Sequence, residues 1–214
     1  GSDKGNFITI EQAMHNRGSN KSCIGCHAET QSSPNCAGCH ALIGKRPLPE
    51  STCITCHAVD KTVLKLSQLN QETMQAIAQK VIDTRQTNFA MIPKDQIPEK
   101  VTINAMVDKY EAATLPHRKI VDALADQMKD NRMANLFHGE GTTLCMGCHH
   151  NSPATTQPPR CAACHGEAYR TKANDGRPGL LGAYHGQCIT CHQAMQIDKP
   201  VATDCTACHK KRTP

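Results

Sequence analysis

The chain has 214 residues and a formal net charge of +5, but it contains only three Phe, three Tyr and no Trp, and 38% of its residues are hydrophobic. This is too little apolar and aromatic material for an ordinary core of that length. Its 14 Cys are well above normal usage, and an even number suggests disulfides in an oxidising compartment, but their spacing excludes that interpretation.

All 14 Cys fall into Cys-x-x-Cys pairs, and a His follows every pair. The motifs are Cys23-Cys26-His27, Cys36-Cys39-His40, Cys53-Cys56-His57, Cys145-Cys148-His149, Cys161-Cys164-His165, Cys188-Cys191-His192 and Cys205-Cys208-His209. Two Cys three residues apart lie about one helical turn from each other and can form thioethers to the two vinyl groups of one porphyrin, while the next His binds the iron as proximal ligand. The pattern predicts seven covalently bound haem c groups.

Structural zinc, a thioredoxin-like redox pair and disulfides are the alternative interpretations of such pairs. A zinc site combines two half-motifs and does not need a His after every pair, and a redox pair occurs once, in a βαβ context. Haem also explains the composition, because a porphyrin is a large flat apolar body that takes the place of missing Phe, Trp and Leu. We therefore expect folding to depend on the cofactor.

Haem changes what the charge implies. A ferric haem with two neutral imidazoles and two propionates carries about −1, so seven haems move the balance from +5 to about −2. We therefore expect no nucleic-acid partner. No run of about 18 apolar residues occurs, so no membrane-spanning segment is expected in this chain. Covalent haem attachment implies export, and we expect a periplasmic protein, in mature form or as a fragment.

Along the chain, the motifs gather at residues 23–57 and 145–209, with a stretch without Cys between them. In that stretch, apolar residues at helical spacing follow Asn70, a suitable N-cap, and predict an amphipathic helix over 71–83. Its apolar stripe consists of Met74, Ile77, Ala78, Val81 and Ile82. Residues 101–103 are a candidate for a short strand.

A second helix is predicted from Pro116, a favourable first-turn residue, to about residue 129. Ile120, Val121 and Leu124 form its stripe, and His117 shares that buried face. Pro and Gly are frequent between the C-terminal motifs, Gly182 and Gly186 among them, and predict loops and single turns held by haem. The expected fold class is mostly irregular, with a few α-helices and little or no sheet.

Five His remain outside the motifs: His15, His117, His138, His150 and His185. Each lies within or just before a group of motifs, and imidazole is an ordinary second axial ligand, so we expect all five to be distal ligands. Two of the seven irons are then left without a distal His. A Met can fill such a position, and Met14, Met91 and Met106 are candidates, but Met more often fills irregular apolar gaps.

The C-terminal group of motifs resembles the tetrahaem cytochrome c3 family. That family places two His ahead of its first motif, one directly after it and one just before its third motif. By this resemblance, the pairs of distal His and attachment Cys are His117 with Cys145, His150 with Cys161, His138 with Cys188 and His185 with Cys205. The family often has a four-residue gap in some motifs, which this chain never has, and the difference points to a subfamily.

Several segments resemble the nine-haem and sixteen-haem high-molecular-mass cytochromes of sulfate-reducing bacteria, and the likeness covers nearly the whole chain. These segments are 97–100, 116–121, 145–153 and 176–180. The resemblance implies a trihaem lobe at 1–57, which is half a c3-like module plus an isolated haem, then a haem-free connector with a helix at 58–115 and a c3-like tetrahaem domain at 116–214. It also implies a C-terminal portion of such a cytochrome.

The same resemblance assigns His15 to the haem at Cys36. It leaves the haems at Cys23 and Cys53 as the ones with a vacant or unusual sixth position, and the haem at Cys53 competes for His117 or His138.

Electron transfer is the leading function. With about 31 residues per haem, neighbouring haems must lie close enough for electron tunnelling. The resemblance implies a carrier that receives electrons from periplasmic hydrogenase through tetrahaem cytochrome c3 and passes them to a membrane redox complex. The alternative is a haem enzyme that reduces a small ligand at a five-coordinate iron. Against it, no motif has Lys in place of the proximal His and no acid–base cluster marks a pocket near Cys23 or Cys53, so we expect no catalytic residues.

Overall fold

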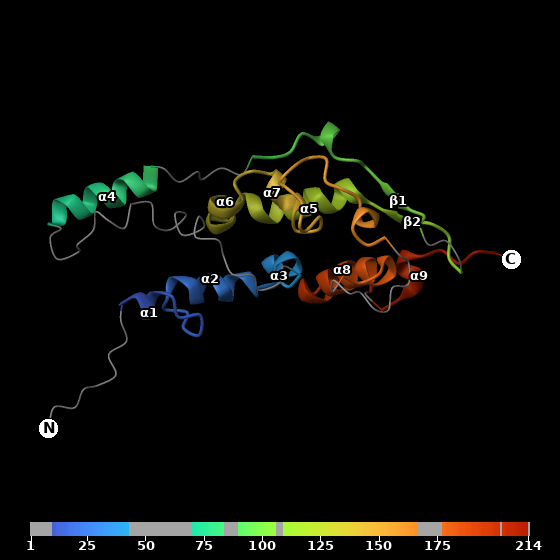
Figure 1. Cartoon of the computed structure of the whole chain (residues 1–214), viewed down its shortest axis with the longest axis horizontal. Coiled ribbons are helices and arrows are strands. Elements are labelled where there is room, and N and C mark those ends of the chain that lie inside the picture. The colour runs from blue at the N-terminus through green and yellow to red at the C-terminus, as the bar shows by residue number, and fades with distance from the viewer. Residues whose placement is uncertain are drawn as a thin grey trace, which may run out of the picture. The chain divides into compact units, whose positions relative to one another are not determined.

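The structure is a computed structural model that describes residues 10–42, 70–83, 90–105, 109–166, 177–201 and 203–213. Short helices make up most of its regular structure (Figure 1). The chain divides into two compact units, and each is built from segments that are far apart in the sequence. The first comprises Gly1–Gly44, Thr102–Thr114 and Arg160–Pro214, and the second Lys45–Val101 and Leu115–Pro159. The predicted haem domains have other boundaries and stay a prediction.

The first unit begins with α1 (Ile10–Met14), α2 (Cys23–Gln31) and α3 (Pro34–His40). Ser22 is the N-cap of α2, and its hydroxyl accepts the backbone N–H of Gly25 at 2.9 Å. Pro34 occupies the first turn of α3, where a missing N–H costs nothing. The two helices pack against each other, so the first two motifs lie on neighbouring helices.

The C-terminal part of the first unit contains η4 (Cys161–Ala163), a 3-10 helix, followed by α8 (Leu180–Ala194) and α9 (Cys205–Cys208). The prediction of loops and single turns is wrong for α8. It treated Gly182 and Gly186 as helix breakers, but both lie inside α8. An isolated Gly costs a helix only about 1 kcal/mol relative to Ala, and packing against α3 and η4 offsets that cost.

The second unit contains α4 (Gln71–Asp83) and η3 (Lys94–Gln96), then α5 (His117–Lys129), α6 (Arg132–His138) and α7 (Thr142–Cys145). The predicted helix over 71–83 is confirmed. Its cap is also confirmed, because the Asn70 side chain accepts the Thr73 backbone N–H at 2.8 Å. The structure does not describe the side chains of its predicted apolar stripe.

The predicted helix from Pro116 is confirmed within one residue, since α5 starts at His117. Its most buried residue is Ala125, and Val121 is half-buried. The prediction is wrong for Ile120, which is 36% exposed. Consecutive residues are about 100° apart around a helix, which places Ile120 at the edge of the face centred near Val121.

The sheet is small. The predicted strand is confirmed as β1 (Val101–Ile103), and it pairs with β2 (Ala113–Leu115), which was not predicted. The expected fold class, mostly irregular with a few helices and little sheet, is confirmed. Within the described ranges, no helix is long and apolar enough to cross a membrane.

Candidate haem sites

Six of the seven motifs lie in the described part of the chain. The seventh, with Cys53, Cys56 and His57, lies outside it. The described Cys are all free of disulfides, as haem attachment requires. The motif helices place them at half-buried or exposed positions, where a large flat group can reach both thiols. The motif positions therefore fit covalent attachment.

Two motifs meet where α3 packs against α8. Gly38, one of the two residues between the Cys of the second motif, is buried, and a Cβ built there would lie 2.5 Å from Met195 Sδ and 2.9 Å from Cys191 Sγ. Only a Gly at this position lets the helix approach Cys191 so closely. The second motif and the motif at Cys188 are therefore direct neighbours.

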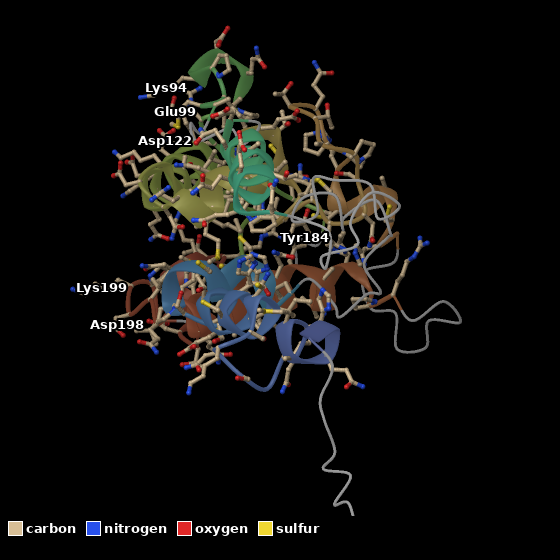
Figure 2. All side chains as sticks on the ribbon, turned by 90° about the vertical axis from the view of Figure 1, so that its left-hand side faces the viewer. Lys94, Glu99, Asp122, Tyr184, Asp198 and Lys199 are labelled. Carbon is tan, nitrogen blue, oxygen red and sulfur yellow. The ribbon has the colours of Figure 1, made fainter. Side chains whose placement is uncertain are left out.

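Tyr184 of α8, which is labelled in Figure 2, joins a third motif to this group. Burial raises the pKa of the Tyr184 hydroxyl, and its electrostatic contact and side-chain hydrogen bond with Cys161 raise the pKa further. Cys188 adds to the same effect. Tyr184 thus lies beside the attachment Cys of two motifs.

The environment of Cys39 shows how closely two motifs approach each other. Burial raises the pKa of this thiol to about 11, and the nearby Cys191 and Cys36 add to the increase. The thiols of the second motif and of Cys191, in the motif at Cys188, therefore lie together in a half-buried setting. Among the described residues, no three His, Cys, Asp or Glu side chains converge as a metal site.

Two predicted distal His lie opposite proximal His of the motifs. The ring centroids of His117 and His149 are 6.5 Å apart with planes at 66°, and those of His185 and His209 are 6.0 Å apart at 89°. An iron bound by two imidazoles separates their centroids by about 6 Å, because each metal–nitrogen bond is about 2 Å and each ring nitrogen lies about 1 Å from its centroid. Both pairs therefore have the spacing that an axially ligated iron needs.

Prolines orient three of the proximal His. The Nδ1 atoms of His149, His165 and His192 lie 3.2, 2.8 and 3.3 Å from the carbonyl oxygens of Pro159, Pro178 and Pro200, respectively. A carbonyl can only accept, so the ring N–H donates, which leaves Nε2 deprotonated and available to a metal. Sequence reasoning missed these acceptors. Their signal was a Pro 8 to 13 residues after the motif His.

Burial also favours the neutral imidazole that binds iron. It lowers the pKa of His40, and it lowers the pKa of His117, where the backbone of Pro98 opposes the shift and His149 adds to it. His117 Nδ1 is a buried atom without a well-formed hydrogen bond. The half-buried position of His117 on α5 agrees with the prediction that it faces inward.

The other candidate distal ligands have different settings. His15 follows α1 and is exposed, His138 ends α6 and is half-buried, and His150 is exposed with Nδ1 2.9 Å from the Asn151 amide nitrogen. Their assignment as distal ligands stays a prediction. Of the candidate Met ligands, Met14 and Met91 are 47% and 51% exposed, and Met106 lies outside the described residues.

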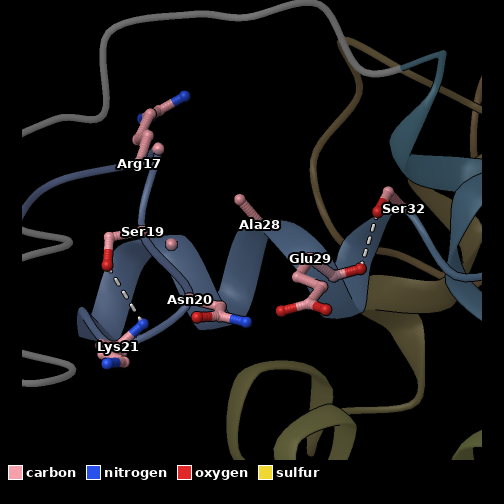
Figure 3. Close-up of a pocket in the computed structure, with 9 residues that line it drawn as sticks. Arg17, Ser19, Asn20, Lys21, Ala28, Glu29 and Ser32 are labelled. Carbon is pink, nitrogen blue, oxygen red and sulfur yellow. Dashed lines mark hydrogen bonds between the residues drawn. The ribbon is translucent and has the colours of Figure 1, made fainter.

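A hollow of about 680 Å³ lies beside α2 (Figure 3). It is bounded by the loop at residues 17–21, by Gly25, Ala28 and Glu29 of the helix, and by its C-cap Ser32. Neither Cys26 nor His27 lines it. The hollow is therefore separate from the haem attachment residues of α2.

Comparison with known proteins gives consistent matches. Residues 114–210 match the Class III cytochrome C family. The chain is 40% identical over 213 residues to the high-molecular-weight cytochrome c of Nitratidesulfovibrio vulgaris, which covers 96% of this chain and 39% of that protein. It is 36% identical over 225 residues to the nine-heme cytochrome c of Desulfovibrio desulfuricans, which covers 98% of this chain and 68% of that one.

A solved structure agrees with these relatives. The high-molecular-weight cytochrome c from Desulfovibrio vulgaris (Miyazaki F) superimposes with a TM-score of 0.82 at 43% identity, over 100% of this chain and 42% of that one. The chain thus spans about two fifths of the length of the high-molecular-weight cytochromes that it matches.

Proposed function

Because the chain belongs to the class III multihaem cytochromes c, the family of the nine-haem and high-molecular-weight cytochromes, we propose that it is a periplasmic electron carrier with seven covalently bound haem c groups. The observation that carries the proposal is the spacing of 6.5 Å and 6.0 Å between facing imidazoles, each pair including one motif His. The family supports the electron-carrier function, and the seven motifs support the haem count.

The chain's own residues hold and orient the cofactors. Haem c supplies a one-electron iron couple when it is bound. The motif Cys would anchor it and the motif His would bind its iron, while His117 and His185 each face one of those His. Hydrogen bonds from Nδ1 to the carbonyls of Pro159, Pro178 and Pro200 fix the ring tautomer and make the imidazole a stronger donor to the metal. Such ligation favours low reduction potentials.

The packing in the first unit supports a route for electrons between motifs distant in sequence. Gly38 lets the second motif lie against Cys191, and Tyr184 links Cys161 to the same helix. We propose that electrons pass among the haems at Cys36, Cys161 and Cys188 through this packed group.

The family likeness supports partners of the kind found in sulfate-reducing bacteria. We propose that the protein receives electrons from hydrogenase through a tetrahaem cytochrome c3 and delivers them to a membrane redox complex. In this proposal the protein is an electron carrier and not an enzyme.

The test uses the mature, haem-loaded chain. Intact mass should show seven haems, and mixing with reduced tetrahaem cytochrome c3 in a stopped-flow instrument should reduce them much faster than hydrogenase alone does. A colourless protein, or a mass without haem, would contradict the haem proposal. Equal rates of haem reduction with and without cytochrome c3 would contradict the proposal that cytochrome c3 is the electron donor. Carbon monoxide binding to the reduced protein, followed by turnover of a small ligand, would favour the enzyme alternative instead.

A further inference from the structure

An aromatic residue from the stretch without Cys contacts the last motif. The ring centroid of Tyr110 lies 5.3 Å from that of His209, with the planes tilted by 39°. His185 lies 6.0 Å from His209, at nearly a right angle. The His209 ring is therefore flanked by the proposed distal ligand and by Tyr110. Tyr110 lies outside the segment that matches the class III family.

Tyr110 is held in place by backbone pairing with the residues that follow His209. The Glu111 N–H donates to the Lys210 carbonyl at 2.8 Å, and the Arg212 N–H donates to the Lys109 carbonyl at 3.2 Å. The Lys210 ammonium adds hydrogen bonds of 2.9 and 3.2 Å to the two carboxylate oxygens of Glu111. Main-chain bonds on both sides thus fix the residue that carries the Tyr110 ring.

His209 differs from the three proximal His whose Nδ1 atoms face proline carbonyls. Within the described part of the chain, no hydrogen bond reaches the His209 ring. The helix before it, α9, has only four residues, and the chain turns at His209 into an extended conformation with φ −120° and ψ 138°. At those three proximal His, a proline carbonyl restrains the orientation of the ring. At His209, the ring contact with Tyr110 takes that role.

We propose that Tyr110 is a positioning residue that sets the orientation of the His209 imidazole at the haem anchored by Cys205 and Cys208. The inference rests on the proposed function, because it requires His209 to bind haem iron. The orientation of an axial imidazole plane determines how its π orbital overlaps the iron d orbitals, so a ring that turns should change the spectrum and the potential of that one centre.

The experiment compares three variants of the full haem-loaded chain. Tyr110→Leu removes the ring but keeps the backbone pairing, Tyr110→Phe keeps the ring, and Glu111→Gln removes the charge pair with Lys210 while the ring stays. Electron paramagnetic resonance of the oxidised protein and a potentiometric titration are the measurements. We expect Tyr110→Leu to shift the g values and the potential of one low-spin centre, and we expect the other two variants to match the wild type.

Two results would overturn the inference. In one, Tyr110→Leu leaves every signal unchanged. In the other, Glu111→Gln produces the same shift, which would assign the effect to the segment pairing rather than to the ring. If Tyr110→Leu does not mature, Tyr110→Ile, which also removes the ring, is measured instead and must shift a single low-spin centre. Absence of low-spin haem from the wild type would contradict the proposed function itself.

Discussion

Two kinds of contact support the described motifs, one seen on α2 and α3 and one seen after residue 140. On α2 and α3, a buried Gly inside the motif, Gly25 or Gly38, lets a neighbouring segment lie directly against the helix. After residue 140, the chain returns after the motif so that a proline carbonyl reaches its His, as at His149, His165 and His192. The same pentapeptide can thus be supported by helix packing or by a returning loop. Only the packed helices should keep their structure without haem.

The largest expected effect comes from removing one haem in each region. In the double variant Cys205→Ala/Cys208→Ala, the four-residue α9 has too few turns to persist alone. We expect its amides to exchange about 100-fold faster, because about 3 kcal/mol of local stability depends on the cofactor. In Cys23→Ala/Cys26→Ala, the capped nine-residue α2 should change by less than about tenfold. Hydrogen exchange followed by mass spectrometry, on chains shown to lack one haem, measures both, and equal loss of protection would contradict the comparison.

The next largest effect is expected at Gly25. A Cβ there would lie 1.9 Å from the Ser19 carbonyl oxygen, which belongs to the backbone and cannot swing away. Gly25→Ala should therefore lower the free energy of unfolding by about 2–3 kcal/mol in a guanidinium titration. The matched control is Gly182→Ala, inside α8, where a Cβ would meet only the Pro178 Cβ at 3.3 Å, and it should change the free energy of unfolding by less than about 1 kcal/mol. Similar behaviour of both variants would remove the argument for close packing at the α2 motif.

A smaller effect is expected at Gly38. A Cβ there would meet the Met195 side chain, which is flexible, as well as Cys191 Sγ, which haem attachment would fix. Gly38→Ala should destabilise the protein by about 1–2 kcal/mol. Adding Met195→Ala should recover part of this loss in a double-mutant cycle. If the two changes in unfolding free energy are additive, the added Cβ does not clash with the Met195 side chain.

The smallest effect is expected at the helix caps of the two regions. Ser22→Ala removes the N-cap of α2 and should cost about 1 kcal/mol of unfolding free energy. Asp204→Ala, at the exposed cap of α9, should cost less. Hydrogen bonds from Thr206 lower the pKa of Asp204, so the contribution of this carboxylate is present at neutral pH and is lost as the pH falls through that lowered pKa. Thermal melts at neutral and acidic pH compare the two caps, and a cost at Asp204 that grows on acidification would contradict the sign.

Sequence reasoning worked where the signal was local. The helical periodicity after Asn70 located α4, and the apolar stripe after Pro116 located α5. The attachment residues that the motif spacing indicates stay a prediction. It failed for α8, because Gly182 and Gly186 were weighed without the packing of that helix on α3 and η4. The acceptors at Pro159, Pro178 and Pro200 and the contact of Tyr110 depend on how the chain returns to a motif. The Pro residues after the motifs are visible in the sequence, but the sequence does not show that their carbonyls reach the motif His.

The pairing of residues 109–111 with 210–212 bears on how multihaem cytochromes can gain further haem-binding segments. The charge pair of Glu111 and Lys210 joins positions 99 residues apart, so the two flanks of the class III segment emerge side by side. A segment whose entrance and exit are adjacent can be duplicated or inserted in tandem with short connections and little rebuilding of its interior. Gene duplication can therefore add class III segments to a multihaem cytochrome one at a time.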